Sequence, residues 1–159
     1  MRLTLSIIGA LTFTNLLANT EFLVRSIQDQ TKLGTVTCSD SPYGLLCQVN
    51  LTLPTGPHGL HIHSANSCAG SGMAAKGHLS LEQQTHLGPY NPMGHLGDLP
   101  VIISNDKQKV DTSILAPRLT ESMLKDRSII VHANGDNYSD NPKPLGGGGP
   151  RIACGLIVK

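Results

Sequence analysis

The stretch Gly56-Pro-His-Gly-Leu-His-Ile-His63 constrains the fold of this chain more than any other. Successive side chains of a β-strand point to opposite faces, so Leu60 and Ile62 are expected on one face and His61 and His63 on the other, exposed face. Two imidazoles on one strand face can converge on a single metal ion, and imidazole suits copper and zinc. A lone His-x-His is more often solvated or structural, so a metal site requires further ligands elsewhere in the chain.

The composition favours a β-rich interior in a chain of single-domain length. There are three Tyr, two Phe and no Trp, so Val, Ile, Leu and Ala must supply the core. The 17 Gly and 10 Pro stand between short apolar runs, as in chains rich in turns and ordered loops. A formal net charge of +1, without a Lys/Arg cluster, argues against a nucleic-acid partner.

Residues 1–20 resemble a secretory signal peptide, which leaves residues 21–159 as the mature domain. Arg2 precedes a largely apolar run at 3–17, and small or polar residues follow, although the usual A-x-A cleavage pattern is poorly met. A buried or membrane helix is disfavoured because the run is short and contains Thr and Asn. No second apolar run is long enough to cross a bilayer. We therefore expect a mature protein without a membrane span, located in the periplasm or secreted.

Short apolar runs predict strands at 21–27, 35–38, 45–53, 58–63, 100–104, 128–132 and 152–158. The piece 114–126 fits either a short helix or irregular structure. Two long polar segments, 64–98 and 133–150, separate these runs. Loops of this length are usually functional or disordered, and the potential metal ligands in the first segment favour function. The pattern predicts a sandwich or barrel of short strands with two long loops.

The four cysteines are an even number in a chain with a signal-like start, which favours disulfides. Sequence alone allows three pairings of Cys38, Cys47, Cys68 and Cys154. In a hairpin, Cys38 and Cys47 can lie opposite each other on the buried side, where they are either a cross-strand disulfide or two core thiols. No Cys-x-x-Cys is present, which disfavours a thiolate zinc site.

Six of the seven histidines share short phrases with Gly and Asp or stand in the His-x-His pair. The phrases are Gly77-His-Leu, Thr85-His-Leu-Gly-Pro-Tyr90, Gly94-His-Leu-Gly-Asp-Leu-Pro100 and Val131-His-Ala-Asn-Gly-Asp136. His58 has the opposite strand parity to His61 and is interpreted as structural. On these motifs, their order and their spacing, the chain resembles the copper/zinc superoxide dismutases of the exported bacterial type over about residues 22–159. This resemblance implies an all-β fold, an eight-stranded antiparallel Greek-key β-barrel or sandwich, immunoglobulin-like, with two long functional loops.

The resemblance also implies one copper and one zinc ion per subunit. The implied copper ligands are His61, His63, His78 and His132. The implied zinc ligands are His78, which bridges the two ions, together with His86, His95 and Asp98. Asp136 would accept hydrogen bonds from one imidazole of each site, and a Cys68–Cys154 disulfide would tie the first loop to the last strand. Arg151 would attract the substrate anion and, with His78, act in catalysis.

The implied activity is dismutation of superoxide to dioxygen and hydrogen peroxide, by alternate reduction and reoxidation of copper bridged to a structural zinc, as antioxidant defence outside the cytoplasm. The rival interpretation is a protein that delivers or buffers metal without turnover, which requires neither a bridging His78 nor Arg151. Asp98 and Asp136 beside glycines also fit turn caps, and Arg151 fits an ordinary surface arginine. Pro150 restricts the backbone before that arginine, which bears on how it would guide the substrate. No interface pattern decides between a monomer and a homodimer.

Overall fold

The computed structural model describes residues 19–82 and 84–158. The expected signal peptide therefore lies outside the described residues, apart from Asn19 and Thr20. The strands are β1 (Thr20–Ser26), β2 (Lys32–Ser41), β3 (Gly44–Thr52), β4 (Gly56–His58), β5 (Leu60–His63), β6 (Ile102–Ser104), β7 (Lys109–Ala116), β8 (Ser128–His132) and β9 (Arg151–Ile157). Three short 3-10 helices complete the described elements: η1 (Met73–Ala75), η2 (Glu121–Leu124) and η3 (Leu145–Gly147). No helix within these residues is long and apolar enough to cross a membrane.

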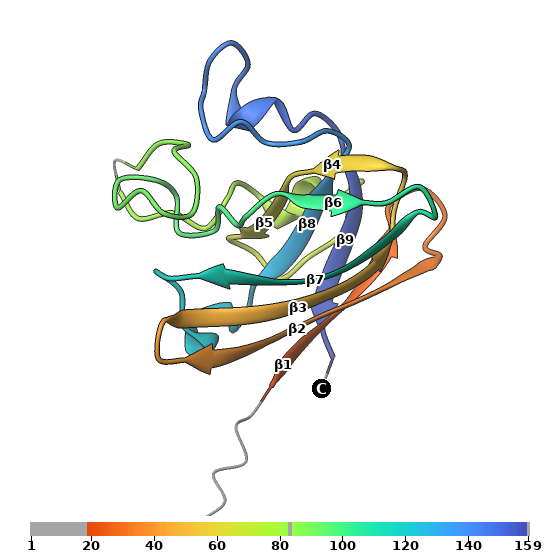
Figure 1. Cartoon of the computed structure of the whole chain (residues 1–159), viewed down its shortest axis with the longest axis horizontal. Coiled ribbons are helices and arrows are strands. Elements are labelled where there is room, and N and C mark those ends of the chain that lie inside the picture. The colour runs from red at the N-terminus through yellow and green to blue at the C-terminus, as the bar shows by residue number, and fades with distance from the viewer. Residues whose placement is uncertain (1–18, 83, 159) are drawn as a thin grey trace, which may run out of the picture.

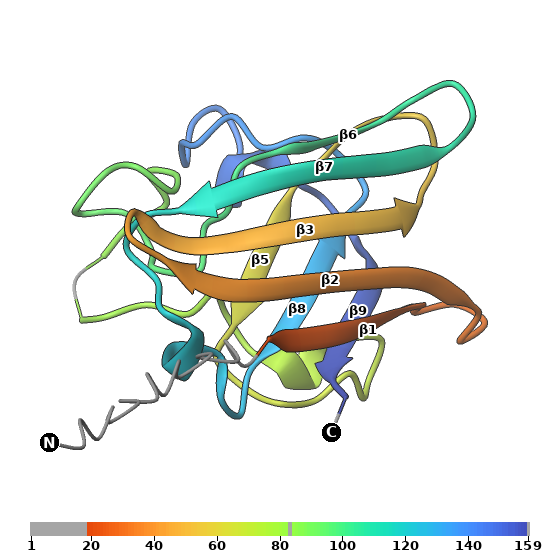
Figure 2. The ribbon, with the colours of Figure 1, turned by 60° about the horizontal axis from the view of Figure 1, so that its bottom comes forward.

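Seven strands form one curled antiparallel sheet in the order β5-β8-β9-β1-β2-β3-β7, and β4 pairs with β6 in a second, two-stranded sheet. Figure 2 shows β1, β2, β3 and β7 side by side in one layer, with β5, β8 and β9 crossing behind them. The all-β prediction is confirmed.

The core lies between these layers and is built from alternate strand positions. Val36 and Cys38 of β2 point inward, as do Cys47, Val49 and the other odd-numbered residues of β3, and all are buried. The face assignment made from strand periodicity is therefore confirmed. Cys38 pairs with Cys47 in register, and the two are joined by a disulfide, which resolves the alternative between a bond and two core thiols.

The stretch 56–63 is not one strand. It divides at Gly59, where β4 ends and β5 begins, and the two pieces pair with different partners, β6 and β8. The amide of Gly59 donates to the carbonyl of Asn134 (2.8 Å), and its carbonyl accepts from the amide of His132 (2.9 Å). Because the chain changes partner at this point, the described strands number nine instead of the expected eight.

The ambiguous piece 114–126 begins within β7, so its interpretation as helix or irregular structure is wrong for residues 114–116. β7 pairs with β3 along its whole length. Val110, Ile114 and Ala116 of β7 point inward and are buried. The spacing of these apolar residues at even-numbered positions is the sequence signal that the interpretation missed. A 3-10 turn, η2, follows at Glu121–Leu124.

Two long connections position the functional residues. The first loop (residues 64–101) follows β5, and the second loop (residues 133–150) follows β8. In Figure 1 the later, green part of the first loop and the blue second loop project from the upper left of the molecule, beyond β5 and β4. The hydroxyl of Tyr138 in the second loop accepts a hydrogen bond from the amide of Val101 (2.9 Å), which joins the two loops directly.

Candidate metal centre

The two histidines of β5 are completely buried, so the expectation that they lie on an exposed strand face is wrong. Leu60 and Ile62 do lie in the core cluster, as the alternation predicts. His61 and His63 point to the opposite face, but the first loop covers them. It forms isolated antiparallel bridges that join His61 to Asp98 and His63 to His78.

Close backbone contact holds the first loop against β5. The amide of Ile62 donates to the carbonyl of Gly97 (2.9 Å), and the carbonyl of Ile62 accepts from the amide of Leu79 (2.8 Å). A Cβ atom on Gly97 would lie only 2.1 Å from the carbonyl oxygen of Ile62, so this approach requires glycine. The contacts place His78 and Asp98 beside the two histidines of β5.

Four buried histidines form the first ligand group: His61, His63, His78 and His132. One possible ligand atom from each lies within 4.8 Å of the others. In each residue one ring nitrogen has a hydrogen-bond partner. The partner is a carboxylate for His61 (Asp136, 2.8 Å) and for His78 (Asp98, 2.8 Å). It is a backbone carbonyl for His63 (Lys76, 2.9 Å) and for His132 (Gly149, 3.0 Å). The other nitrogen, Nδ1 of His61 and Nε2 of the remaining three, is buried without a hydrogen-bond partner among the described residues.

Asp98 is the anionic member of the second ligand group: His78, His86, His95 and Asp98. Its carboxylate oxygens lie 2.8 Å, 3.1 Å and 3.3 Å from Nδ1 of His78, His86 and His95. Burial by itself raises the pKa of Asp98, but the close approach of these three imidazoles lowers it far below its usual value. Three imidazole nitrogens around one charged carboxylate make up a donor set that suits tetrahedral zinc.

Asp136 of the second loop connects the two groups. Its Oδ2 accepts from Nε2 of His61 and its Oδ1 from Nε2 of His86, each at 2.8 Å. The amide of Tyr138 donates to Oδ1 as well (2.7 Å). Burial raises the pKa of Asp136, but the hydrogen bonds from His61 and His86 more than offset this, so the pKa is lowered. The charged carboxylate thus fixes the orientation of one imidazole from each group.

Burial keeps most of these imidazoles neutral. It lowers the pKa of His61 to about 3, that of His63 to about 2 and that of His132 to about 4. The neutral imidazole is the form that binds a metal ion. His86 differs: burial lowers its pKa, but the hydrogen bond to Asp136 and the nearby carboxylate of Asp98 raise it to about 9. Without a metal, its imidazolium is the cation between the two carboxylates.

We expect the metal-free protein to lose stability as the pH falls from 6.5 to about 4. In this window the unfolded chain protonates His61, His63 and His132, whereas the folded chain does not, so unfolding takes up protons. Each histidine then weakens the fold by about 1.4 kcal/mol per pH unit. Urea unfolding in the presence of a chelator, at several pH values in this range, measures the slope. A free energy of unfolding that does not change with pH would contradict the burial of neutral imidazoles.

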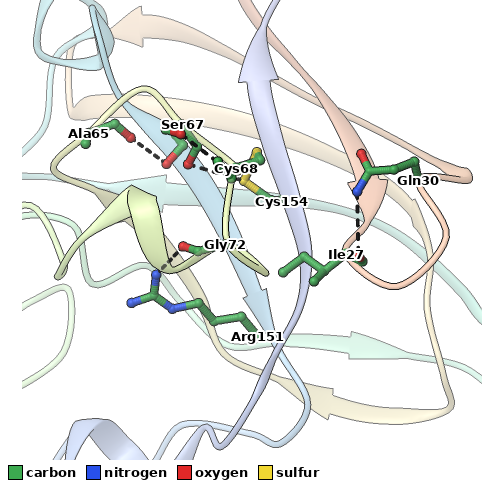
Figure 3. The surroundings of a disulfide bond; sticks show 10 residues. Ile27, Gln30, Ala65, Ser67, Cys68, Gly72, Arg151 and Cys154 are labelled. Carbon is green, nitrogen blue, oxygen red and sulfur yellow. Dashed lines mark hydrogen bonds between the residues drawn. A yellow bond between two sulfur atoms is a disulfide. The ribbon is translucent and has the colours of Figure 1, made fainter.

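Arg151 begins β9 and pairs in register with His132. Its guanidinium donates to the carbonyl of Gly72 and, at 2.6 Å, to that of Lys76, as Figure 3 shows for the first of these contacts. The carbonyl of Lys76 therefore receives both Arg151 and His63. The sequence could not reveal this role of Lys76, because the carbonyl of any residue type would serve.

The disulfide between Cys68 and Cys154 joins the first loop to β9, as the resemblance implied. Figure 3 places this bond close to Gly72 and Arg151. His58, interpreted as structural, lies outside both ligand groups. Its ring nitrogens lie 2.8 Å from the carbonyl oxygens of Pro54 and His132.

Comparison with known proteins agrees with this geometry. The family model described as copper/zinc superoxide dismutase (SODC) matches residues 32–157. A Cu-Zn superoxide dismutase of Legionella pneumophila is 50% identical over 127 residues, which cover 79% of this chain and 77% of that protein. One of Escherichia coli K12 is 43% identical over 136 residues, with coverage of 79% and 78%.

Solved structures show the same relationship. The Cu/Zn superoxide dismutase from Brucella abortus superposes with a TM-score of 0.82 at 41% identity, over 89% of this chain and all of the other (100%). The monomeric copper, zinc superoxide dismutase from Salmonella enterica gives a TM-score of 0.76 at 39% identity, with coverage of 89% and 100%. The chain belongs to the copper/zinc superoxide dismutases, the oxidoreductases that use copper and zinc to dismutate superoxide.

Proposed function

We propose that the first ligand group holds the copper ion and the second holds the zinc ion, with His78 shared between them. The observation that carries this assignment is the set of four buried ring nitrogens in the first group that lack hydrogen-bond partners among the described residues. A buried polar atom without a partner is costly, and four of them on neighbouring imidazoles indicate a common cation. An all-imidazole set suits copper.

The second ligand group fits zinc for a different reason. Nδ1 of His86 and Oδ2 of Asp98 are also buried without hydrogen-bond partners in the described part of the chain, although they lie 3.1 Å apart. An ion between them would satisfy both atoms and replace the imidazolium charge of His86. Zinc does not change its oxidation state, so its place in the closed second group is structural.

When bound, copper supplies the one-electron oxidation and reduction of superoxide. The residues of the chain select the substrate and handle the protons. Arg151 carries a fixed positive charge next to His132, where it attracts a small anion. Formation of hydrogen peroxide consumes two protons. We assign Nε2 of His78, when it is not serving as a ligand, as the donor of one and water as the donor of the other. Asp136 keeps His61 and His86 in their binding orientation.

We also propose that the protein is exported. Two disulfides, Cys38–Cys47 and Cys68–Cys154, form in oxidising compartments such as the bacterial periplasm. Residues 1–20 would act as the signal peptide and residues 21–159 as the mature enzyme, a monomer or a homodimer. Release of the protein by osmotic shock and its elution volume in size exclusion test these statements.

The assignment of the ligands is tested with the purified protein loaded with copper and zinc. We expect one ion of each per chain and rapid removal of superoxide. His95→Ala should release zinc before copper, because His95 belongs only to the second group, whereas His78→Ala should weaken both ions and turnover. If both ions bind tightly without turnover, the protein is a metal carrier. If His95→Ala retains zinc, the zinc assignment is wrong.

A further inference from the structure

The guanidinium of Arg118, which stands outside the histidine phrases of the sequence, contacts four backbone carbonyls. Its Nε donates to the carbonyl of Pro89 (3.0 Å) and its Nη1 to that of Gly94 (2.7 Å). Its Nη2 reaches the carbonyls of Gly88 (3.3 Å) and His95 (2.6 Å). No carboxylate in the described part of the chain lies within ion-pair distance of this guanidinium. The side chain is therefore directed entirely to backbone.

The four carbonyls belong to one piece of the first loop, residues 85–95, which we call the clamped segment. Two of them, at Gly88 and Pro89, follow the proposed zinc ligand His86. The other two are at the far end of the segment, and one is the carbonyl of the ligand His95 itself. One guanidinium thus bridges the two limbs of the segment.

The clamped segment has little regular structure of its own. The amide of His95 donates to the carbonyl of Thr85 (3.0 Å), and the amide of Thr85 donates to the carbonyl of Met93 (3.2 Å). The limbs approach so closely that a Cβ atom on Gly94 would lie 2.7 Å from the carbonyl oxygen of Gly88. Such irregular backbone loses conformational entropy when it is ordered, on the order of 1–2 kcal/mol per residue, so the closed arrangement needs a partner.

The position of Arg118 in the chain allows its side chain to be that partner. It lies between β7 and η2, and the next residue, Leu119, is buried in the main core and donates its amide to the carbonyl of Ala116 (3.2 Å). The guanidinium is planar and offers five N–H groups in fixed directions, and the carbonyl contacts use four of them. Arg118 therefore joins the rigid sheet to the clamped segment.

We propose that Arg118 is a positioning residue for zinc: its guanidinium holds the two limbs of the clamped segment together, so that His86 and His95 stand at the separation that the ion requires before it binds. This inference rests on the proposed zinc site. A segment that is already ordered binds its ion more tightly, because only the fraction of molecules with the competent arrangement can bind. Loss of such an indirect partner typically lowers metal affinity about 10–100-fold.

The test compares Arg118→Lys with Arg25→Lys in the otherwise intact protein. Lysine keeps the charge at position 118 but cannot reach four carbonyls. Arg25 is an exposed arginine whose side chain donates to a single carbonyl within residues 19–82 and 84–158, that of Gln30 (3.0 Å), and makes a matched control. Zinc affinity is measured by competition with a chromophoric chelator, and the visible spectrum of bound cobalt reports the geometry of the site. We expect a zinc affinity about 10–100-fold lower and an altered cobalt spectrum for Arg118→Lys, with neither change for Arg25→Lys.

Two further variants distinguish an error in the proposed zinc site from an error in the proposed role of Arg118. His95→Ala must abolish tight zinc binding; if it does not, the proposed zinc site is wrong whatever Arg118 does. If His95→Ala loses zinc while Arg118→Lys binds it as tightly as the parent protein, Arg118 is only a structural brace, even when the melting temperature falls. Gly94→Ala keeps the arginine but forces the limbs apart, so it should lower zinc affinity as Arg118→Lys does. An unchanged affinity in Gly94→Ala would also overturn the inference.

Discussion

Replacing both Cys68 and Cys154 by alanine is expected to lower the free energy of unfolding of the metal-free protein by about 4–5 kcal/mol. The reason lies mainly in the unfolded chain. The two residues are 86 positions apart, so the bond closes a long loop and removes much of the conformational freedom of the unfolded state. Urea unfolding of the chelator-treated protein, compared with the parent, measures the difference.

The second disulfide provides the control. Cys38 and Cys47 are only nine positions apart, and the same chain-entropy relation gives about 2–3 kcal/mol for their bond. Both sulfurs lie in the fully buried core, so alanine at these positions adds the cost of a small cavity. If removal of the Cys68–Cys154 bond lowers the free energy of unfolding clearly less than removal of the Cys38–Cys47 bond, that bond does not act mainly by restricting the unfolded chain.

The Cys68–Cys154 disulfide, which closes the longer loop, also has a local role. It fixes the part of the first loop whose carbonyls, at Gly72 and Lys76, receive the guanidinium of Arg151. The double alanine variant should therefore lose part of its turnover even at temperatures where it stays folded. Turnover equal to that of the parent in the folded variant would show that the two carbonyls hold Arg151 without the bond.

Strand periodicity predicted the orientation of side chains well but not their environment. The alternation from Leu60 to His63 correctly separated core residues from histidines, because strand geometry is local. It could not show that the histidines are buried. That depends on Gly97 and Asp98, more than thirty positions away, folding back over β5.

The same distinction explains what was missed. The alternation in Lys109–Ala116 is imperfect, since Thr112 stands at an inward position and the apolar Leu115 at an outward one, and its strand depends on pairing with β3. Arg118 stands in no metal-binding phrase, and its partners are backbone carbonyls, which carry no sequence signature. The members of the two proposed ligand groups could be named from the sequence through the family resemblance, because they stand in the histidine and aspartate phrases that carry it.

Gly146→Ala is expected to damage both metal sites without altering any ligand. Gly146 adopts a left-handed backbone conformation (φ 68°), and a Cβ atom there would lie 1.8 Å from Oδ1 of Asp136 and 2.8 Å from Nε2 of His86. The carboxylate would have to turn away and give up its hydrogen bonds to His61 and His86. We expect copper and zinc affinity to fall about 10–100-fold, as when groups that orient metal ligands are lost.

Gly147→Ala is the control: it places alanine in left-handed backbone without a clash at Asp136. Gly147 has a similar conformation (φ 73°), but the nearest atom to its Cβ position is Cβ of Lys143 at 3.8 Å. Both variants should lose about 1–2 kcal/mol of stability, because alanine disfavours left-handed backbone. Only Gly146→Ala should also lose metal affinity, measured by chelator competition, and turnover in proportion. Equal metal affinities in the two variants would mean that Asp136 can leave His61 and His86 without consequence, and its proposed role in orienting them would be wrong.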